Sequence, residues 1–305
     1  MPRPALFFFN EQDSDSLAAT FGPVVITQLS LLKAGVSMGL RDLTAARAEV
    51  VRALNAANVP VTAWLLLSRD EGYFATHTNV EAIEAAYTRL MAWARHHQLH
   101  LTGLGLDFEP DLRELDELMA RPGLTLAKWL LRRGRGPVVE QARTAYQRLV
   151  ERARGDGLRV ETYQFPVIVD DRRATSQFWQ RTMGALALEA DREVPMVYTS
   201  LLGAAGPGLL EHWAPHCRAI AVGSTGGGID PFPKLSWAEL ERDLVVAARH
   251  AREVFIFSLE GCVEQGLLER LASVEWDRTV IRGPPTHRLL AAGAARMIGA
   301  LAQWF

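Results

Sequence analysis

Two acidic side chains end one apolar run of the sequence, and their spacing suits acid–base chemistry. Asp107 and Glu109 close the segment Gly103–Pro110 and are separated by one residue. Because side chains alternate along a strand, the two carboxyl groups face the same way. Two neighbouring carboxylates repel each other, so we expect one of them to keep its proton near neutral pH, as a general acid requires. Gly105 belongs to the same row and is expected to leave space beneath them.

Two further acids lie in other apolar runs. Glu260 ends the last run and shares a strand face with Ser258. If that face points inward, Glu260 lies across a pocket from Glu109, and such a carboxylate pair is what glycoside hydrolysis uses. Glu161 lies inside another run, where burial is costly unless the charge is paired. Facing inward beside the preceding strand, Glu161 would tune Asp107.

Ordinary ion pairs are the alternative for each of these acids, because the sequence is rich in arginine. The Asp-x-Glu pair could close a strand end with Arg69 or Arg113. Glu161 could face a helix and pair with Arg159, and Glu260 could pair with an arginine of a neighbouring loop.

Polar and aromatic residues near the ends of the apolar runs are candidates for substrate contacts. A polar group at the end of a buried strand loses hydration unless something uses it, and an aromatic ring stacks well on the apolar face of a sugar. The candidates are Asn10, Trp64, Tyr163, Gln164, Tyr198 and Ser258.

The elements that must position these residues alternate between short apolar runs and longer helical patterns. Eight runs are predicted to be strands: Ala5–Asn10, Val24–Leu29, Val59–Leu67, Thr102–Glu109, Leu158–Phe165, Val194–Ser200, Ala219–Ser224 and Glu253–Glu260. Continuous apolar strands indicate a parallel sheet that is buried on both faces. Eight β–α repeats close most simply into a (β/α)8 TIM barrel. The alternative, an open doubly wound sheet, lacks its usual glycine fingerprint after the first strand.

The barrel is expected to form one domain over residues 1–305, because no linker divides the chain. Two of its helices are predicted to begin with a capping box, at Thr78 with Glu81 and at Ser236 with Glu239. In a TIM barrel the active site gathers at the carboxyl ends of the strands, where most of the candidate residues lie.

The end of the fourth predicted strand resembles the core of the family-18 chitinase motif, Asp-x-x-Asp-x-Asp-x-Glu. Asp107 and Glu109 match its last two acids, and Met196-Val197-Tyr198 is similar to the Met-x-Tyr of that family. The resemblance implies that Glu109 is the general acid and that Asp107 and Tyr198 position an N-acetyl group. The two earlier motif aspartates are replaced by Thr102 and Gly105, and the usual tryptophan of the eighth strand is absent. The resemblance therefore favours a barrel glycosidase more than a chitinase.

Composition excludes several other classes of protein. The chain has 305 residues, of which 49% are hydrophobic and 22% charged, and its formal net charge is −2. This balance disfavours bulk electrostatic binding to nucleic acid or to an anionic membrane, and no window is apolar enough for a membrane helix. With no signal-peptide pattern, we expect a cytoplasmic protein.

Cofactor chemistry is also not expected. None of the three lysines lies on an inner strand, where Schiff-base chemistry would need one. The histidines are placed on helices, so we expect neither a catalytic metal nor a cofactor. The glycine run Gly223–Gly228 follows the seventh predicted strand, where many barrels bind phosphate.

The sequence thus predicts a glycoside hydrolase that acts on a small or modest oligosaccharide, with retention, through Glu109, Asp107 and Glu260. Two alternatives stay open: a phosphate-sugar isomerase or lyase that uses the glycine run, and a barrel that binds carbohydrate without cleaving it. The sequence makes no prediction of the oligomeric state.

Overall fold

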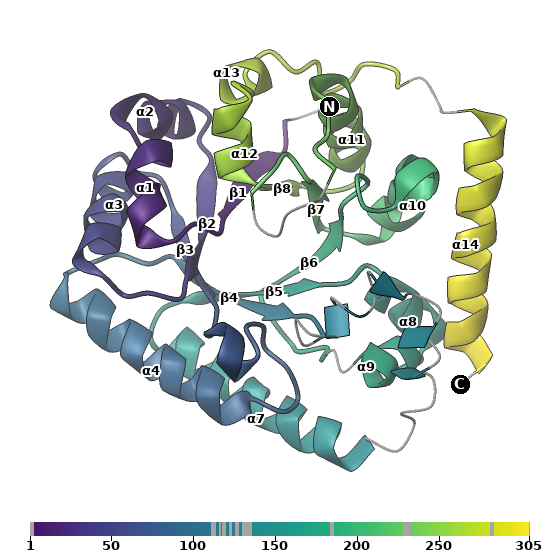
Figure 1. The fold of residues 1–305 in the computed structure, drawn as a ribbon, viewed down its shortest axis with the longest axis horizontal. Helices are drawn as coiled ribbons and strands as arrows, with labels where there is room; N and C mark the ends of the chain where they lie inside the picture. The colour runs from purple at the N-terminus through teal and green to yellow at the C-terminus, as the bar shows by residue number, and fades with distance from the viewer. Residues whose placement is uncertain are drawn as a thin grey trace.

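Eight parallel strands close into a barrel, which confirms the predicted (β/α)8 fold (Figure 1). The computed structural model describes residues 3–110, 114, 115, 117, 120, 121, 124, 125, 128, 129, 136–183, 186–227, 233–280 and 284–304. The strands are β1 (Ala5–Asn10), β2 (Gly35–Leu40), β3 (Val61–Leu65), β4 (Gly103–Phe108), β5 (Arg159–Gln164), β6 (Arg192–Val197), β7 (Ala219–Gly223) and β8 (Glu253–Phe257). Each strand pairs with the next one along the chain, and β8 pairs with β1 to close the barrel.

Helices surround the barrel (Figure 1). They are α1 (Ser14–Thr20), α2 (Pro23–Leu31), α3 (Ala45–Ala56), α4 (Val80–His96), α7 (Gly136–Gly155), α8 (Ile168–Ala174), α9 (Phe178–Met183), α10 (Gly206–Trp213), α11 (Trp237–Ala248), α12 (Leu259–Glu264), α13 (Leu268–Leu271) and α14 (Pro285–Trp304), with short 3-10 turns η1 (Arg69–Glu71), η2 (Gly203–Ala205) and η3 (Ala214–His216). The terminal helix α14 lies against α8 and α10. In the described part of the chain, no helix combines the length and apolarity needed to cross a membrane.

The predicted second strand, Val24–Leu29, is wrong. These residues belong to α2, which begins after Gly22 with Pro23 in its first turn, a position where proline favours a helix. The true second strand, β2, has the sequence GVSMGL. A Cβ atom at Gly35 would lie 2.6 Å from the ring of Phe7. The small residues of β2 are therefore needed to admit large side chains from other strands, and this need is invisible in the local sequence.

One of the two predicted capping boxes is present. The Ser236 hydroxyl accepts the Glu239 N–H, and the Glu239 carboxylate accepts the Ser236 N–H, at the start of α11. The predicted box at Thr78 is wrong, because α4 begins after Asn79 and its cap position makes no side-chain bond to the helix. A capping box that the sequence reading missed joins Ser68 to Glu71 in η1, the turn that follows β3.

The barrel interior holds a charged layer near the amino ends of the strands. Arg192 forms ion pairs with Glu161 and Glu253, and its guanidinium carbon lies 4.4 Å from the ring centre of Phe7. Tyr163 donates a hydrogen bond of 2.9 Å to Glu161 from above. This layer lies in the lower half of the barrel, below the carboxyl ends of the strands, where the candidate site lies.

Candidate active site

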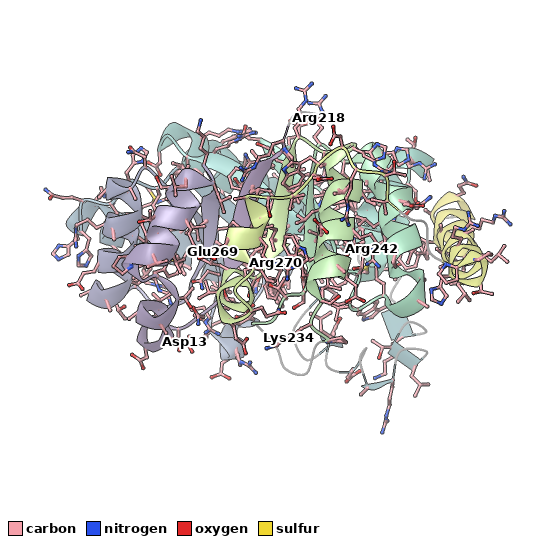
Figure 2. The ribbon with its side chains drawn as sticks, turned by 90° about the horizontal axis from the view of Figure 1, so that it is seen from above. Asp13, Arg218, Lys234, Arg242, Glu269 and Arg270 are labelled. Carbon is pink, nitrogen blue, oxygen red and sulfur yellow. The ribbon has the colours of Figure 1, made fainter. Side chains whose placement is uncertain are left out.

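The candidate acids gather at the end of the barrel where the strands terminate. Figure 2 shows the barrel from the side: Asp13 and Lys234, which follow β1 and β7, lie at one end, and Arg218, which precedes β7, lies at the other. The end marked by Asp13 and Lys234 is thus the carboxyl end of the strands, and we call it the mouth. It is the end at which TIM-barrel active sites form.

Asp107 is placed on the inner face of β4, as predicted. The alternate residues of β4, including Leu106 and Phe108, pack outward in the main hydrophobic core. The Asp107 side chain is buried, and its Oδ1 atom has no hydrogen-bond partner among the described residues; the same is true of the indole nitrogen of Trp64. Burial, together with the charges of Glu109 and Glu11, raises the pKa of Asp107 well above its ordinary value, while Trp64 lowers it by a smaller amount. The surroundings of Asp107 therefore favour its protonated form.

Glu109 follows the last residue of β4 and is less buried than Asp107. Burial and the charge of Glu11 raise the pKa of Glu109 to about 8. Its carboxyl group makes no hydrogen bond within the described part of the chain, so its proton is not committed to a neighbour. Glu109 can therefore present an acidic proton to a ligand near neutral pH.

Glu11 is a candidate site residue that the sequence did not predict. It follows β1, and its carboxylate accepts a hydrogen bond from the hydroxyl of Tyr73. Burial raises the pKa of Glu11, and the positive charges of Arg41 and Arg69 oppose that rise. In the sequence, Glu11 is only an acid that directly follows the predicted strand end at Asn10. An acid in such a position is also common in ordinary loops.

Glu260 lies at the mouth, but on a helix and not at the end of a strand as predicted. The strand β8 ends at Phe257, and Glu260 lies in the first turn of α12. The inward face of β8 carries Phe255 and Phe257, which contact the aromatic rings inside the barrel, so the predicted inward face was the wrong one. The Glu260 carboxylate accepts hydrogen bonds from Asn10 Nδ2 at 3.0 Å and from the Glu11 backbone N–H at 3.3 Å.

The pKa of Glu260 is raised to about 7. Burial is the largest cause, and the hydrogen bonds from Asn10 and from backbone N–H groups lower the pKa by smaller amounts. Glu260 is thus close to half-ionised at neutral pH.

A cavity of about 700 Å³ opens beside Glu11 and Glu260. It is lined by Glu11, Gln12, Asp13, Ser16, Ala19, Thr20, Arg41, Arg69, Tyr73, Gly227, Glu260, Val263 and Glu264. Its size lies within the range of small-molecule sites. The lining comes from the segments after β1, β2, β3, β7 and β8, so the cavity extends along one side of the mouth.

Three of the predicted contact residues lie with the acids in the mouth. Tyr198 follows β6 and is half-buried, and the charges of Asp107 and Glu109 add to burial in raising its pKa. Trp64 lies under Asp107 and packs edge-on against Phe9, with ring centres 5.2 Å apart. The Asn10 side chain binds Glu260 through Nδ2, while its Oδ1 atom has no partner in the described regions.

Four other predicted site residues lie away from the mouth or have their polar groups engaged. Glu161 lies in the lower charged layer, paired with Arg192, so it does not act on Asp107. The fully buried Tyr163 hydroxyl bonds to Ser37 at 2.6 Å, in addition to its bond with Glu161. These contacts assign Glu161 and Tyr163 to the core of the barrel.

Gln164 and Ser258 are also structural. Gln164 alternates with Tyr163 and points outward, where it donates to the Leu186 carbonyl at 3.2 Å. The Ser258 hydroxyl donates to the Gly226 carbonyl and accepts the Gly261 N–H at the start of α12. Both side chains are fully buried, so neither is free to contact a substrate.

The glycine run after β7 packs against an acid. A Cβ atom at Gly227 would lie 2.5 Å from Glu260 Oε1, and a carboxylate this close opposes the binding of phosphate. Gly228 lies outside the described residues. Within the described ranges, no group of three His, Cys, Asp or Glu side chains is arranged to hold a metal ion.

Comparisons with known proteins support the fold. No family model and no curated protein sequence matches the chain. The structure is similar to the PgaB (BpsB) glycoside hydrolase domain from Bordetella bronchiseptica, with a TM-score of 0.52 and 13% identity over 91% of this chain and 100% of that one. It is also similar to a D-allulose 3-epimerase from Methylomonas sp. (TM-score 0.42, 12% identity, 98% and 99% of the two chains) and to a mutant tryptophan synthase alpha-subunit from Pyrococcus furiosus (0.43, 12%, 90% and 98%). At 13% identity, the likeness to the glycoside hydrolase domain shows a shared TIM-barrel fold.

Proposed function

We propose that this protein is a retaining glycoside hydrolase in which Glu109 is the general acid and base. The observation that carries the proposal is the state of Glu109: it lies at the end of β4, and its pKa is raised to about 8. A glycosidase needs a carboxylic acid that keeps its proton at working pH and gives it to the oxygen of the leaving group. No partner within the described residues competes for that proton.

Asp107 has a supporting role in this proposal. Burial and the charge of Glu109 raise the pKa of Asp107 well above its ordinary value, which favours a neutral Asp107 beside Glu109. A neutral Asp107 can donate a hydrogen bond to a substrate or to Glu109 without adding a second negative charge. Its unpartnered Oδ1 and the unpartnered Trp64 indole N–H offer an acceptor and a donor that a sugar hydroxyl can satisfy.

Aromatic side chains of the mouth fit a carbohydrate. Tyr198 packs against Phe257 with ring centres 5.4 Å apart, next to the two acids of β4. Such rings supply apolar surface for the face of a sugar. The similarity to a glycoside hydrolase domain agrees with this substrate class.

A panel of 4-nitrophenyl glycosides and of unactivated oligosaccharides tests the proposal. We expect turnover of both classes for at least one sugar. In Glu109→Gln, activity on oligosaccharides should fall by roughly 10²–10⁴-fold, because the proton donor is lost. The loss should be much smaller with the nitrophenyl glycosides, whose leaving oxygen departs with little protonation.

The same panel separates the alternatives. A protein that binds sugars in calorimetry but turns over no glycoside would be a carbohydrate-binding barrel. Equal losses in Glu109→Gln on both substrate classes would mean that another residue is the general acid. Binding that depends on a phosphate group would favour the isomerase or lyase. It would also contradict the expectation that the Glu260 carboxylate beside Gly227 opposes phosphate.

A further inference from the structure

The carboxylate of Glu260 is held and covered on several sides. Both oxygens accept hydrogen bonds, one from Asn10 and the other from the Glu11 backbone N–H. The backbone of Gly227 covers Oε1, since a Cβ atom there would lie at 2.5 Å from it. Glu260 also has no cation among the groups that lower its pKa. It ties the end of β1 to α12, which is a bracing role.

Glu11 lies nearer to the acids of β4 than Glu260 does. The charge of Glu11 raises the pKa of Asp107 and of Glu109, whereas the charge of Glu260 contributes to neither. The charge of Glu11 also acts on Tyr198. Glu11 directly follows β1 and lines the cavity of the mouth. Because such effects decay with distance, its charge is the closer of the two to the β4 acids.

A chain of polar contacts favours the ionised form of the Glu11 carboxylate and opposes the burial that raises its pKa. The Tyr73 hydroxyl donates to Glu11, Arg41 donates to the Tyr73 oxygen at 3.2 Å, and Arg41 is ion-paired with Asp13. Tyr73 has a φ of 63°, a left-handed conformation that is costly for a bulky residue and recurs at functional sites. Arg69, on the cavity rim, adds a second positive charge near Glu11.

We infer that Glu11 is the carboxylate that works with Glu109 at the anomeric carbon of the substrate, and that Glu260 braces it. This inference rests on the proposed glycoside hydrolase function and deepens it. It replaces the partner that the sequence predicted with the neighbouring acid of β1, whose side chain lines the cavity.

The reaction follows from these two carboxyl groups. Glu109 gives its proton to the glycosidic oxygen as the C1–O bond breaks, and the bonding electron pair leaves with that oxygen. A Glu11 oxygen forms an ester bond to C1. Water then gives a proton to Glu109 and attacks C1, and the ester bond breaks to restore the Glu11 carboxylate. Atoms and charges balance, and the net reaction consumes one water molecule.

Covalent trapping tests the inference directly. The wild-type protein is incubated with the 2,4-dinitrophenyl 2-deoxy-2-fluoro glycoside of the sugar that the panel identifies, digested with trypsin and analysed by mass spectrometry. Trypsin releases Glu11 and Glu260 on different peptides, because Lys33 and Arg252 lie between them. We expect the label on Glu11.

Variants provide a second measurement. Glu11→Ala should lose activity on both leaving-group classes, on the order of 10³-fold or more. Sodium azide should restore its turnover of the dinitrophenyl glycoside and yield a glycosyl azide. Glu11→Gln keeps the bond from Tyr73 and serves if the alanine variant does not fold. Glu260→Gln should stay within about tenfold of the wild type, and the exposed Glu49→Gln is the matched control with no loss.

The possible outcomes separate this inference from the proposed function. A label on Glu260, or near-normal activity of Glu11→Ala, overturns the role of Glu11; the leaving-group signature of Glu109→Gln would then still support a glycoside hydrolase. The absence of any label during turnover also overturns it, because the ester would not form. If no glycoside in the panel reacts, both proposals fail.

Discussion

The ring of Tyr163 occupies the space that Gly105 leaves inside the barrel. A Cβ atom at Gly105 would lie 2.5 Å from the Tyr163 hydroxyl oxygen and 2.6 Å from its ring. The sequence predicted open space beneath the β4 carboxyl groups. Instead, the glycine lets an aromatic ring from β5 cross under them, and this ring closes the floor of the mouth.

Gly105→Ala should therefore destabilise the protein, because the Tyr163 ring is fixed by bonds to Ser37 and Glu161. We expect a loss of about 1–3 kcal/mol in the free energy of unfolding, which is typical of overpacking. Urea denaturation measures it. Gly155→Ala is the matched control, since a Cβ atom there meets nothing within 4 Å. An unchanged stability in Gly105→Ala would show that the Tyr163 ring can move aside.

The charged layer below the mouth gives a prediction about stability alone. Arg192→Met leaves Glu161 buried without its cation, so the free energy of unfolding should fall by about 3–5 kcal/mol. The double variant Arg192→Met/Glu161→Met should recover much of this loss, because the buried carboxylate is then gone and Glu253, which also loses Arg192, still lies 3.7 Å from Arg159. Chemical denaturation measures both. Activity of the folded double variant should stay near that of the wild type. A large loss of activity would show that Glu161 contributes to the active site.

The fold was largely predictable because seven of the eight strands are continuous apolar runs of the right length. The exception shows what the local sequence lacks. The strand β2 has two glycines and a serine. These small residues are explained only by the large side chains of Phe7 and Tyr163, which come from other strands. By contrast, the β-branched residues of α2 imitate a strand, and the helix start at Pro23 decides against it.

The candidate site was predictable only in part. Asp107 lies on the inner face of β4, as the alternation of side chains predicted, and Glu109 directly follows that strand. The strand β8 is apolar on both faces, and a one-residue change of register reverses which residues point inward. The role of Glu11 depends on its contacts with Tyr73 and with Glu260 of α12, and these three residues lie in separate segments of the chain. No pattern within one segment could reveal it.

Arg69 gives a prediction about the acidic side of the pH–rate profile. Its charge lowers the pKa of Glu11, and the inferred mechanism needs Glu11 ionised. In Arg69→Met the pKa of Glu11 should rise, so the acidic limb of kcat/KM should move to higher pH. Added salt should weaken the difference, because Arg69 is exposed. The exposed Arg89→Met is the control. An identical pH–rate profile in both variants would show that the charge of Arg69 does not act on the titrating group.

Glu109 should also make the stability of the protein depend on pH. Its pKa rises from 4.5 to about 8 on folding, so the folded state binds more protons between these values, and stability falls as pH increases through this window. Glu109→Gln carries no such proton. The stability of this variant relative to the wild type should therefore grow from pH 4.5 to pH 8, by roughly 1–3 kcal/mol. Thermal denaturation across this range measures the difference, and a constant difference would mean that Glu109 keeps an ordinary pKa.

The raised pKa of Glu109 sets the basic side of the pH–rate profile. Because the general acid must be protonated in the free enzyme, kcat/KM for an unactivated oligosaccharide should fall as pH rises through about 8. A 2,4-dinitrophenyl glycoside needs little protonation, so its profile should stay nearly flat over the same range. Measuring both substrates in one buffer series removes any general loss of the folded protein, which would lower both rates together. A basic limb that is equally steep for the two substrates would show that the group titrating near pH 8 is not the proton donor.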